Sequence, residues 1–233
     1  MSSALTSSST VRLGRLRRTI GRRLRESVTT KPSVTLHTTA AAEALLAALD
    51  DARASGTRAS VTALVAEPTV RALRAHPALN AHVSEEELTV FDEVRLGVAV
   101  DTPRGLVVPV IPHAELMDAR EIGAAIAALA ERARAAELTP ADVLDATFTI
   151  TSLGSFGVEQ FTPIVNPPQV GVLGIGAIRT VAARHDDQWI EQPVIHLSLT
   201  FDHAALDGAP AARFLADLVE HLGGPVQPSK ESP

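Results

Sequence analysis

Apolar residues recur along this chain with two different spacings, and the segments that carry them do not alternate strictly. Spacings of three and four residues, typical of an amphipathic helix, are clearest over 118–136. Alternating or continuous apolar runs, typical of strands in a partly buried sheet, occur over 147–151, 170–178 and 194–201. This mixture predicts an α/β (α+β) two-layer sandwich, with a mixed β-sheet and helices on one face. A doubly wound nucleotide-binding fold is disfavoured, since no G-x-G-x-x-G follows a strand and opens a helix.

The remaining elements follow from the same patterns and from turn residues. Residues 1–10 are rich in Ser and Thr and are expected to be disordered, and 223–233 to form a flexible polar tail, which leaves a single domain over 11–222. The residues at 185–188 favour a hairpin turn between two short strands. Further expected helices cover 12–28, 40–54, 60–75 and 209–222, and further expected strands cover 33–37, 88–91, 95–100, 106–111, 181–184 and 189–192.

The composition excludes several classes of protein. The chain has no cysteine, which excludes disulfides, thiolate zinc sites, iron–sulfur clusters and a cysteine nucleophile. No apolar run approaches the length of about 18 residues that spans a bilayer. Only 3% of the residues are aromatic, with no tyrosine, which is little for a surface that stacks nucleic-acid bases. We therefore expect a cytoplasmic protein with no metal site, no nucleic-acid partner and no membrane partner.

Charge is distributed unevenly along the chain. Residues 1–31 hold eight basic residues against the single acid Glu26, although the whole chain carries a net charge of -6. A basic, Ser-rich start fits the composition of a mitochondrial transit peptide. It also fits a solvated helix face, a nucleic-acid arm, or a site for a polyanionic cofactor. Composition alone favours the first two interpretations.

Among the eight histidines, His203 has the most distinctive surroundings. It follows the apolar run that ends at Phe201 and precedes a predicted helix, within the sequence DHAALDG at 202–208. A strand-to-helix corner exposes a side chain on a rigid support, and Asp207 can orient the local structure. From these residues alone, the alternative is a loop histidine beside a helix-capping aspartate.

A second candidate lies at the end of the strand expected over 147–151. The sequence TFTITSLGSFG at 147–157 ends an apolar strand in hydroxyls and in glycines, which permit close backbone approach. A hydroxyl in such a place can stabilise an oxyanion, and ordinary strand-end turn chemistry is the alternative. The sequence is not a G-x-S-x-G elbow, and no chain-order triad is evident.

Five stretches, in a fixed order, identify the family that the chain resembles. They read RLRRTIGRR at 15–23, LGVAVDTPRGLVVPVI at 96–111, FTITSLG at 148–154, FTPIVNPPQV at 161–170 and DHAALDG at 202–208. From about Val11 to Leu222 the chain resembles the catalytic domain of the dihydrolipoamide acyltransferase component of 2-oxo-acid dehydrogenase complexes. Chloramphenicol acetyltransferase shares that fold. The resemblance implies a chloramphenicol-acetyltransferase-like sandwich and an enzyme that transfers acyl groups from a coenzyme A thioester.

The resemblance also implies a role for particular residues. His203 matches the family's histidine, the general base that acts on the thiol or hydroxyl of the acceptor. Thr151 matches the family's serine, whose hydroxyl donates to the tetrahedral oxyanion, and neighbouring Ser152 is the alternative. Asp207 matches the acid that fixes the histidine loop, through an arginine of the basic segment such as Arg17. No tightly bound cofactor is implied, because coenzyme A is a co-substrate.

The family's architecture implies a homotrimer whose active sites lie in channels between subunits. His203 would come from one chain and Thr151 from its neighbour, with coenzyme A and the acceptor entering from opposite ends. Because the resemblance begins inside the basic segment, that segment is expected to belong to the fold and not to a cleaved presequence. Clustered guanidinium groups bind phosphates well. Arg17, Arg18 and Ser152 are therefore the candidate residues for binding coenzyme A.

Three departures from the family pattern bear on the acceptor. Only about ten residues precede the matched region, where a complete dehydrogenase acyltransferase carries lipoyl and peripheral-subunit-binding domains. The usual Asp-His-Arg reads Asp202-His203-Ala204, with the alanine that is found in the chloramphenicol enzymes. The tail after Leu222 is polar and Pro-rich, whereas the large cubic cores dock an apolar C-terminus into a neighbouring trimer.

These departures predict a stand-alone O-acetyltransferase that forms a free trimer. Its acceptor would be a small-molecule hydroxyl, for which a tetronate-type intermediate of polyketide antibiotic biosynthesis is one hypothesis. The alternative is the lipoyl-less catalytic core of a 2-oxo-acid dehydrogenase complex, which transfers acyl groups between dihydrolipoamide and coenzyme A. A third interpretation, a catalytically quiet scaffold, is disfavoured because His203, the Thr151 hydroxyl and Asp207 are all retained.

Overall fold

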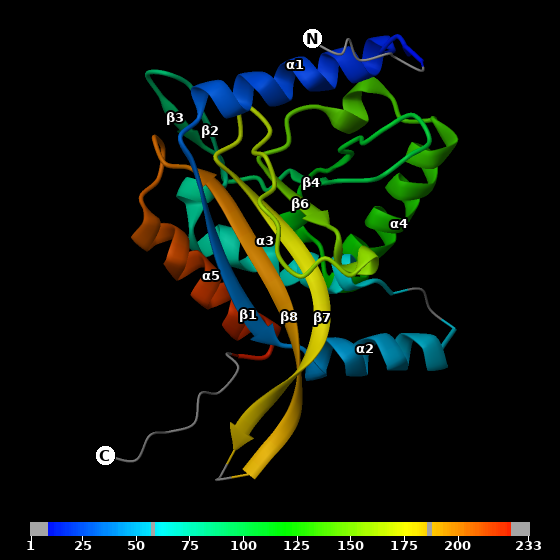
Figure 1. The fold of residues 1–233 in the computed structure, drawn as a ribbon, viewed down its shortest axis with the longest axis vertical. Coiled ribbons are helices and arrows are strands. Elements are labelled where there is room, and N and C mark those ends of the chain that lie inside the picture. Colours follow the sequence, from blue (N-terminus) through cyan, green and yellow to red (C-terminus); the bar gives the residue numbers. More distant parts are fainter. Residues whose placement is uncertain (1–8, 57–58, 186–187, 225–233) are drawn as a thin grey trace, which may run out of the picture.

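The computed structural model describes residues 9–56, 59–185 and 188–224, and in these a mixed six-stranded sheet is the central element (Figure 1). The strand order is β1-β8-β7-β6-β4-β5, with β4, β6 and β7 parallel to one another and the remaining neighbours antiparallel. The strands are β1 Ser33–Ala41, β4 Leu96–Val98, β5 Val110–Ile111, β6 Phe148–Ser152, β7 Gly171–His185 and β8 Gln188–Asp202, and a separate small sheet pairs β2 Ala81–Val83 with β3 Leu88–Val90.

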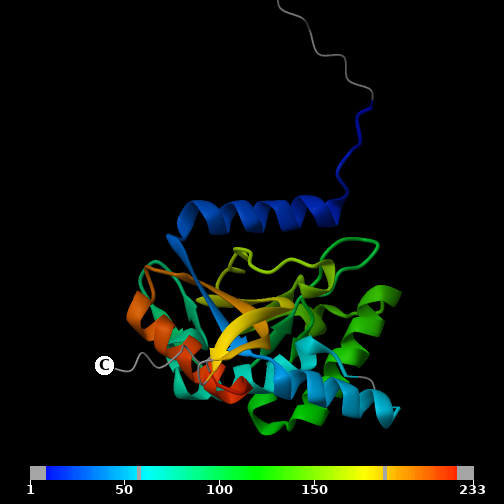
Figure 2. The same cartoon turned by 60° about the horizontal axis from the view of Figure 1, so that its bottom comes forward.

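Helices cover both sides of the large sheet, but unequally. On one face α3 and α5 pack against the strands, with α4 beside α3, and α2 follows the end of β1 (Figure 1). Figure 2 shows that α1 crosses the opposite side. The expected α/β sandwich with a mixed sheet is confirmed, and α1 is an addition on the second face. The helices are α1 Arg15–Thr30, α2 Glu43–Ala54, α3 Val61–Ala75, α4 Ala119–Ala135 and α5 Gly208–Leu222.

Strand β8 gives the sheet one apolar and one polar face. Side chains alternate between the faces of a strand. Leu197, Leu199 and Phe201 are fully buried in the main hydrophobic cluster, and Ser198 and Thr200 alternate with them. The hydroxyls are nearly as inaccessible to water as the apolar residues, at 1% exposure each. Both faces of β8 are therefore covered. The helices cover the apolar face, and a non-helical segment of the chain covers the face that carries the hydroxyls.

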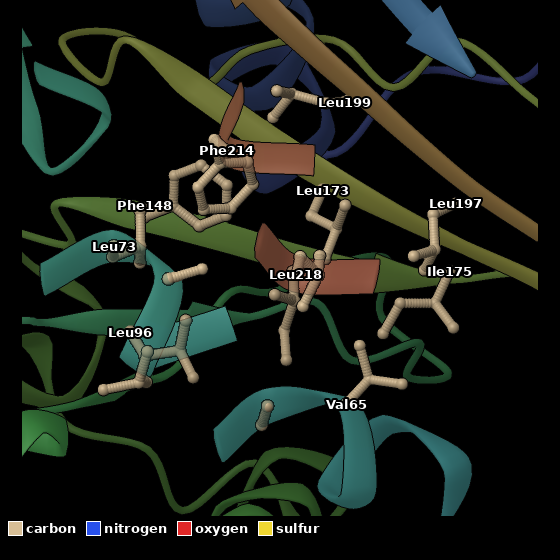
Figure 3. Packing of buried hydrophobic residues seen from close by; sticks show 14 of the residues in the cluster. Val65, Leu73, Leu96, Phe148, Leu173, Ile175, Leu197, Leu199, Phe214 and Leu218 are labelled. Carbon is tan, nitrogen blue, oxygen red and sulfur yellow. The ribbon is translucent and has the colours of Figure 1, made fainter. Parts of the chain in front are cut away.

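The apolar face is closed by the side chains of α3 and α5 (Figure 3). The ring of Phe148 on β6 lies beside the ring of Phe214 on α5, with centroids 5.9 Å apart. Each large apolar side chain buried in this way stabilises the fold by about 1.5–3 kcal/mol. The other residues labelled in Figure 3 are Val65, Leu73, Leu96, Leu173, Ile175, Leu197, Leu199 and Leu218.

The polar face is covered by residues 153–170, the segment that joins β6 to β7. This segment lies so close to β7 that a Cβ added at Gly176 would overlap the carbonyl oxygen of Glu159. Helix α1 lies over the segment in turn, because the buried Ser27 hydroxyl donates to the carbonyl oxygen of Val165 at 2.6 Å. The second face is thus a stack of sheet, loop and basic helix.

The expected helix over 40–54 is wrong at its start. Ala40 and Ala41 continue β1, where they pair with Ile195 and Val194 of β8, and α2 begins only at Glu43. Alanine favours a helix in isolation. Here the backbone hydrogen bonds and the burial of Ala40 at 0% exposure outweigh that preference.

The hairpin expected around 185–188 is confirmed in register, since His185 pairs with Gln188, while residues 186–187 lie outside the described part. The four short strands expected on its two sides are two continuous strands of 15 residues each, β7 and β8. Pro193 does not interrupt β8 because it lies just before Val194, the first residue of β8 that pairs with β1. A proline is tolerated at a position where a strand has no neighbour to receive its N–H.

The strand expected over 106–111 is also shorter in the structure. Only Val110 and Ile111 form β5, and Val107 makes an isolated bridge with Val100. The segments expected to be disordered, 1–10 and 223–233, lie mostly outside the described residues, so those boundaries stay predictions.

The contact between Gly176 and Glu159 makes a prediction about stability. Replacing Gly176 by alanine forces the 153–170 segment away from β7, and overpacking of this kind costs about 1–3 kcal/mol in the free energy of unfolding. We expect Gly176→Ala to lower Tm by several degrees in a thermal melt. Gly123→Ala in α4 is the matched control, because its new Cβ would lie 3.6 Å from that of Ala63, an ordinary contact. A Gly176→Ala protein that melts with the Gly123→Ala control would contradict this packing.

Candidate active site

His203 lies in the loop that joins β8 to α5. The strand ends at the buried Asp202, and the turn is closed by hydrogen bonds from the Ala205 and Leu206 N–H groups to the Asp202 carbonyl, both at 3.1 Å. The His203 N–H donates to the Pro32 carbonyl at 3.0 Å. Its backbone is therefore fixed, while its imidazole is 42% exposed and free to meet a substrate.

Asp207 is the one acid that the structure places near the His203 ring in the described part of the chain. Its Oδ1 lies 3.9 Å from His203 Nδ1, which is too long for a hydrogen bond but close enough for attraction to an imidazolium. Asp207 is also the N-cap of α5, although its side chain makes no capping hydrogen bond. The structure thus brings together the two residues of the DHAALDG motif that the sequence singled out.

One residue in contact with this loop was missed by the sequence analysis. Lys31, at the C-terminal end of α1, donates to Asp202 Oδ2 at 2.7 Å. Both residues are buried in the contact, with side-chain exposures of 7% and 5%. A separation of 171 positions leaves no local signal that relates them.

At the end of β6, Thr151 and Ser152 point to opposite faces of the sheet. Thr151 follows Thr149 on the polar face, where the Thr149 hydroxyl donates to Gln169 Oε1 at 2.7 Å. Ser152 lines a cavity on the helix side, together with residues of α3 and α4. The two hydroxyls therefore cannot replace one another in the same role without a change in the backbone.

Within one chain, Thr151 and His203 are far apart. Thr151 pairs with Gly174 of β7, which pairs with Ser198 of β8, and β8 runs on to Asp202 before His203 is reached. With strands about 4.8 Å apart and a rise of about 3.3 Å per residue, the separation is about 15 Å or more. A general base and an oxyanion donor must both lie about 3 Å from the reacting group. A site that uses both residues therefore needs a second chain.

The cavity beside Ser152 has a volume of about 1020 Å³. It lies between the C-terminal ends of β4 and β6, the middle of β7, the N-terminus of α3 and one side of α4. Its wall combines apolar groups and hydroxyls with two cations, Arg53 and Arg134, and two acids, Asp101 and Glu131, which suits a long ligand that carries several polar groups. Residues that line it include Ser60, Arg53, Arg134, Ser152, Ser155 and Phe156.

Another acid on the covered polar face is unsuited to act as a base. Arg179 Nε donates to Glu159 Oε1 at 2.8 Å, and this hydrogen bond lowers the pKa of Glu159 below its usual value. His196 Nε2 lies 4.0 Å from the second carboxylate oxygen. A carboxylate with a lowered pKa holds a proton poorly near neutral pH. His203 is consequently the better candidate for moving a proton.

Arg17 and Arg18 lie on α1 and do not line the cavity that contains Ser152. The Arg17 guanidinium reaches Gly105, with Nη2 3.2 Å from the position that a Cβ would occupy there. No bond between Arg17 and Asp207 is present in the described part of the single chain. Of the three residues proposed to bind coenzyme A, the structure thus gives only Ser152 a place in the cavity.

Over residues 9–56, 59–185 and 188–224, no three His, Asp or Glu side chains are grouped so that they could hold a metal ion. Over the same residues, no helix is both long and apolar enough to cross a membrane.

Comparisons with known proteins agree with this fold and extend it. Residues 6–228 match the model of the family described as 2-oxoacid dehydrogenases acyltransferase (catalytic domain). The chain is 44% identical over 170 residues to the dihydrolipoyllysine-residue acetyltransferase component of the acetoin cleaving system of Bacillus subtilis (strain 168). That match covers 73% of this chain but only 43% of the relative, so the chain spans less than half of that protein.

Solved structures give the same result. A dihydrolipoamide acetyltransferase of Azotobacter vinelandii, in which the catalytic roles of a serine, a histidine and an asparagine were investigated, matches with a TM-score of 0.87 at 32% identity. The match covers 93% of this chain and 91% of that one. The cubic core of a pyruvate dehydrogenase multienzyme complex matches equally well, with the same TM-score of 0.87, identity of 32% and coverage. A chloramphenicol acetyltransferase, 12% identical with a TM-score of 0.52 over 86% of this chain and 94% of that one, shares the fold alone.

The expectation of a stand-alone enzyme that acetylates a small-molecule hydroxyl, such as a tetronate, is wrong. The relative at 44% identity is a dihydrolipoyllysine-residue acetyltransferase, and no comparison supports an alcohol acceptor. Ala204, one basis of that expectation, donates its backbone N–H to Asp202 Oδ1 at 3.0 Å, a contact that any residue other than proline can make.

The expectation of a free trimer is wrong for a related reason. It rested on the polar tail, whose residues 225–233 lie outside the described part, and a structure at 32% identity is a cubic core. The sequence motifs, the fold and the solved structures at 32% identity agree with the family model that matches residues 6–228. The chain belongs to the family of 2-oxoacid dehydrogenase acyltransferases, as a catalytic domain.

Proposed function

We propose that this chain catalyses acyl transfer between a dihydrolipoyl group and coenzyme A. The observation that carries the proposal is the placement of His203, whose backbone is fixed by Pro32 and whose imidazole is exposed. Its Nε2 has no hydrogen-bond partner in the described residues, so it is available to a thiol. The Bacillus relative, named for a dihydrolipoyllysine residue, supports the identity of the acceptor.

The proposed chemistry uses one base and one hydroxyl. His203 takes the proton of the attacking thiol, and the sulfur attacks the carbonyl carbon of the acyl thioester. The hydroxyl of Thr151 donates to the carbonyl oxygen as it becomes negative. When the tetrahedral intermediate collapses, the bond to the other sulfur breaks, and that sulfur receives the proton from His203. The reaction exchanges one thioester for another in both the forward and the reverse direction, so the same residues serve in either direction.

A second chain is part of this proposal. Thr151 and His203 lie about 15 Å or more apart in one chain, so we place the site between two copies, as in a homotrimer. In the Azotobacter enzyme the investigated histidine and asparagine are four positions apart, as are His203 and Asp207 here. This likeness supports His203, Asp207 and the Thr151 hydroxyl as the reacting constellation.

The cavity beside Ser152 is the proposed site for coenzyme A. Its hydroxyls and the guanidinium groups of Arg53 and Arg134 suit the phosphates of the nucleotide, and its apolar wall suits the pantetheine arm. In this proposal, Ser152 contacts coenzyme A, and Thr151 alone donates a hydrogen bond to the oxyanion. The basic residues Arg17 and Arg18 remain candidates for phosphate contacts from a neighbouring chain.

The function is tested by following acyl transfer from acetyl-CoA to dihydrolipoamide, through the release of coenzyme A thiol and the formation of the acetyl thioester. His203→Ala should lower kcat by about 10²- to 10⁴-fold, because the thiol loses its base. His113→Ala is the control, since His113 is exposed in a turn away from the loop. If the wild-type chain transfers no acyl group to dihydrolipoamide, the proposal fails.

The position of the site between chains is tested by complementation. Thr151→Val should lower kcat by about 10²- to 10³-fold, whereas Thr151→Ser should keep most activity because the hydroxyl remains. When His203→Ala and Thr151→Val chains are unfolded and reassembled together, activity should return above that of either variant. Such mixed assemblies contain sites with an intact histidine from one chain and an intact threonine from another. No recovery would mean that each site lies within one chain.

The coenzyme A site is tested on α4. Arg134→Ala should raise KM for acetyl-CoA by about tenfold or more, with little change in kcat, because a charge-assisted contact to phosphate is lost. Arg120→Ala on the same helix is the control, since Arg120 does not line the cavity. An unchanged KM in Arg134→Ala would place coenzyme A elsewhere.

A further inference from the structure

Lys31 and Asp202 form a buried ion pair directly beside His203. Lys31 Nζ donates to Asp202 Oδ2 at 2.7 Å, with only 7% and 5% of the two side chains exposed. The second carboxylate oxygen, Oδ1, accepts the N–H of Ala204 at 3.0 Å. Asp202 thus links the cation on one side to the residue that follows His203 on the other.

The backbone repeats this connection one residue further on. Pro32, the residue after Lys31, accepts the N–H of His203 at 3.0 Å. Lys31 itself ends α1, where its N–H donates to the Ser27 carbonyl at 2.9 Å. The junction between α1 and β1 therefore holds Asp202 and His203 at two consecutive positions, once through a side chain and once through the main chain.

Stability alone gives a weak reason for such a pair. Moving two charges out of water costs as much as their attraction returns, and apolar substitutes are often as stable. Removing only one partner is different, because it leaves an uncompensated buried charge. Without Lys31, the buried Asp202 carboxylate loses its counter-charge, and a rotation of its side chain towards water would release the Ala204 N–H. In the described residues, Lys31 is the only cation in hydrogen-bonding contact with Asp202.

We propose that Lys31 is a positioning residue for His203: it holds Asp202 so that the turn at 202–206 presents the imidazole at a fixed place. The inference rests on the proposed acyl transfer, in which His203 is the base. Placement matters because an error of about 1 Å in a reacting group can cost about 10²-fold in rate. Lys31 touches no substrate, and its effect passes through Asp202 and the loop backbone.

The first experiment separates positioning from general support of α1. In Lys31→Met, kcat should fall by about 10- to 100-fold, while KM for acetyl-CoA and for dihydrolipoamide stays within about twofold. Lys31→Arg, which keeps the charge, should recover most of the activity. Ser27→Ala is the matched control, because it removes a buried tether of the same helix, to Val165, without touching the His203 loop. We expect Ser27→Ala to lower Tm and to leave kcat within about twofold of wild type.

The second experiment does not depend on activity. Hydrogen–deuterium exchange read by mass spectrometry should show faster exchange of peptides over 202–206 in Lys31→Met, since the Ala204 amide loses its fixed partner on the Asp202 side chain. The same peptides should be unchanged in Ser27→Ala, and β6 peptides unchanged in both. If the wild-type chain has no acyl transfer, the proposed function fails, and exchange still tests the positioning.

Several outcomes would overturn the inference. These are a Lys31→Met protein with wild-type kcat, equal losses of kcat in Lys31→Met and Ser27→Ala, or unchanged exchange over 202–206. If Lys31→Met does not fold, the double variant Lys31→Met with Asp202→Asn removes both charges and keeps the same comparison. Under the proposal, this double variant folds but its kcat stays low, because residue 31 no longer holds the side chain of residue 202.

Discussion

The alternation of side chains along β8 is the constraint on which the other features depend. One set of its residues, ending at Phe201, completes the apolar core against α3 and α5. The other set, ending at Asp202, faces the loop and the basic helix on the opposite side. Because the strand ends on this second set, its last side chain meets Lys31, and the next residue, His203, leaves the sheet at a defined point. A shift of one residue in the register would exchange the two sets and would bury the carboxylate in the apolar core.

The same alternation places the two hydroxyls at the end of β6 on opposite faces of the sheet. Thr151 lies on the polar face and Ser152 on the helix side, where a cavity of about 1020 Å³ opens beside it. In the proposed reaction, one strand thus offers one hydroxyl to the reacting carbonyl and another to a bound co-substrate. His203 is about 15 Å or more from Thr151 in the same chain, so the proposed reaction makes catalysis depend on assembly. Under that proposal, a single chain that folds correctly would still lack a complete site.

Patterns within a short stretch of sequence predicted local structure well. The helix expected over 118–136 from its apolar spacing agrees with α4 to within one residue at each end. Asp118 and Glu121 form a capping box at its start, and Ala136 ends it in a left-handed conformation. The errors arose where distant strands decided the outcome, as at Ala40 and Ala41, which pair with β8. Ala204 misled the choice of acceptor because its contribution is a backbone N–H, which any residue other than proline supplies.

The sequence by itself determined the family, the class of fold and the motif that contains His203 and Asp207, because these depend on local order along the chain. Only the tertiary structure decided which face each hydroxyl of β6 occupies and which residues hold the histidine loop. Lys31 and Asp202 are 171 positions apart, and their contact exists only because β1 and β8 pair in one register. Contacts of this kind leave no spacing to read in a sequence, since they are set by the pairing of whole strands and by the burial that pairing produces.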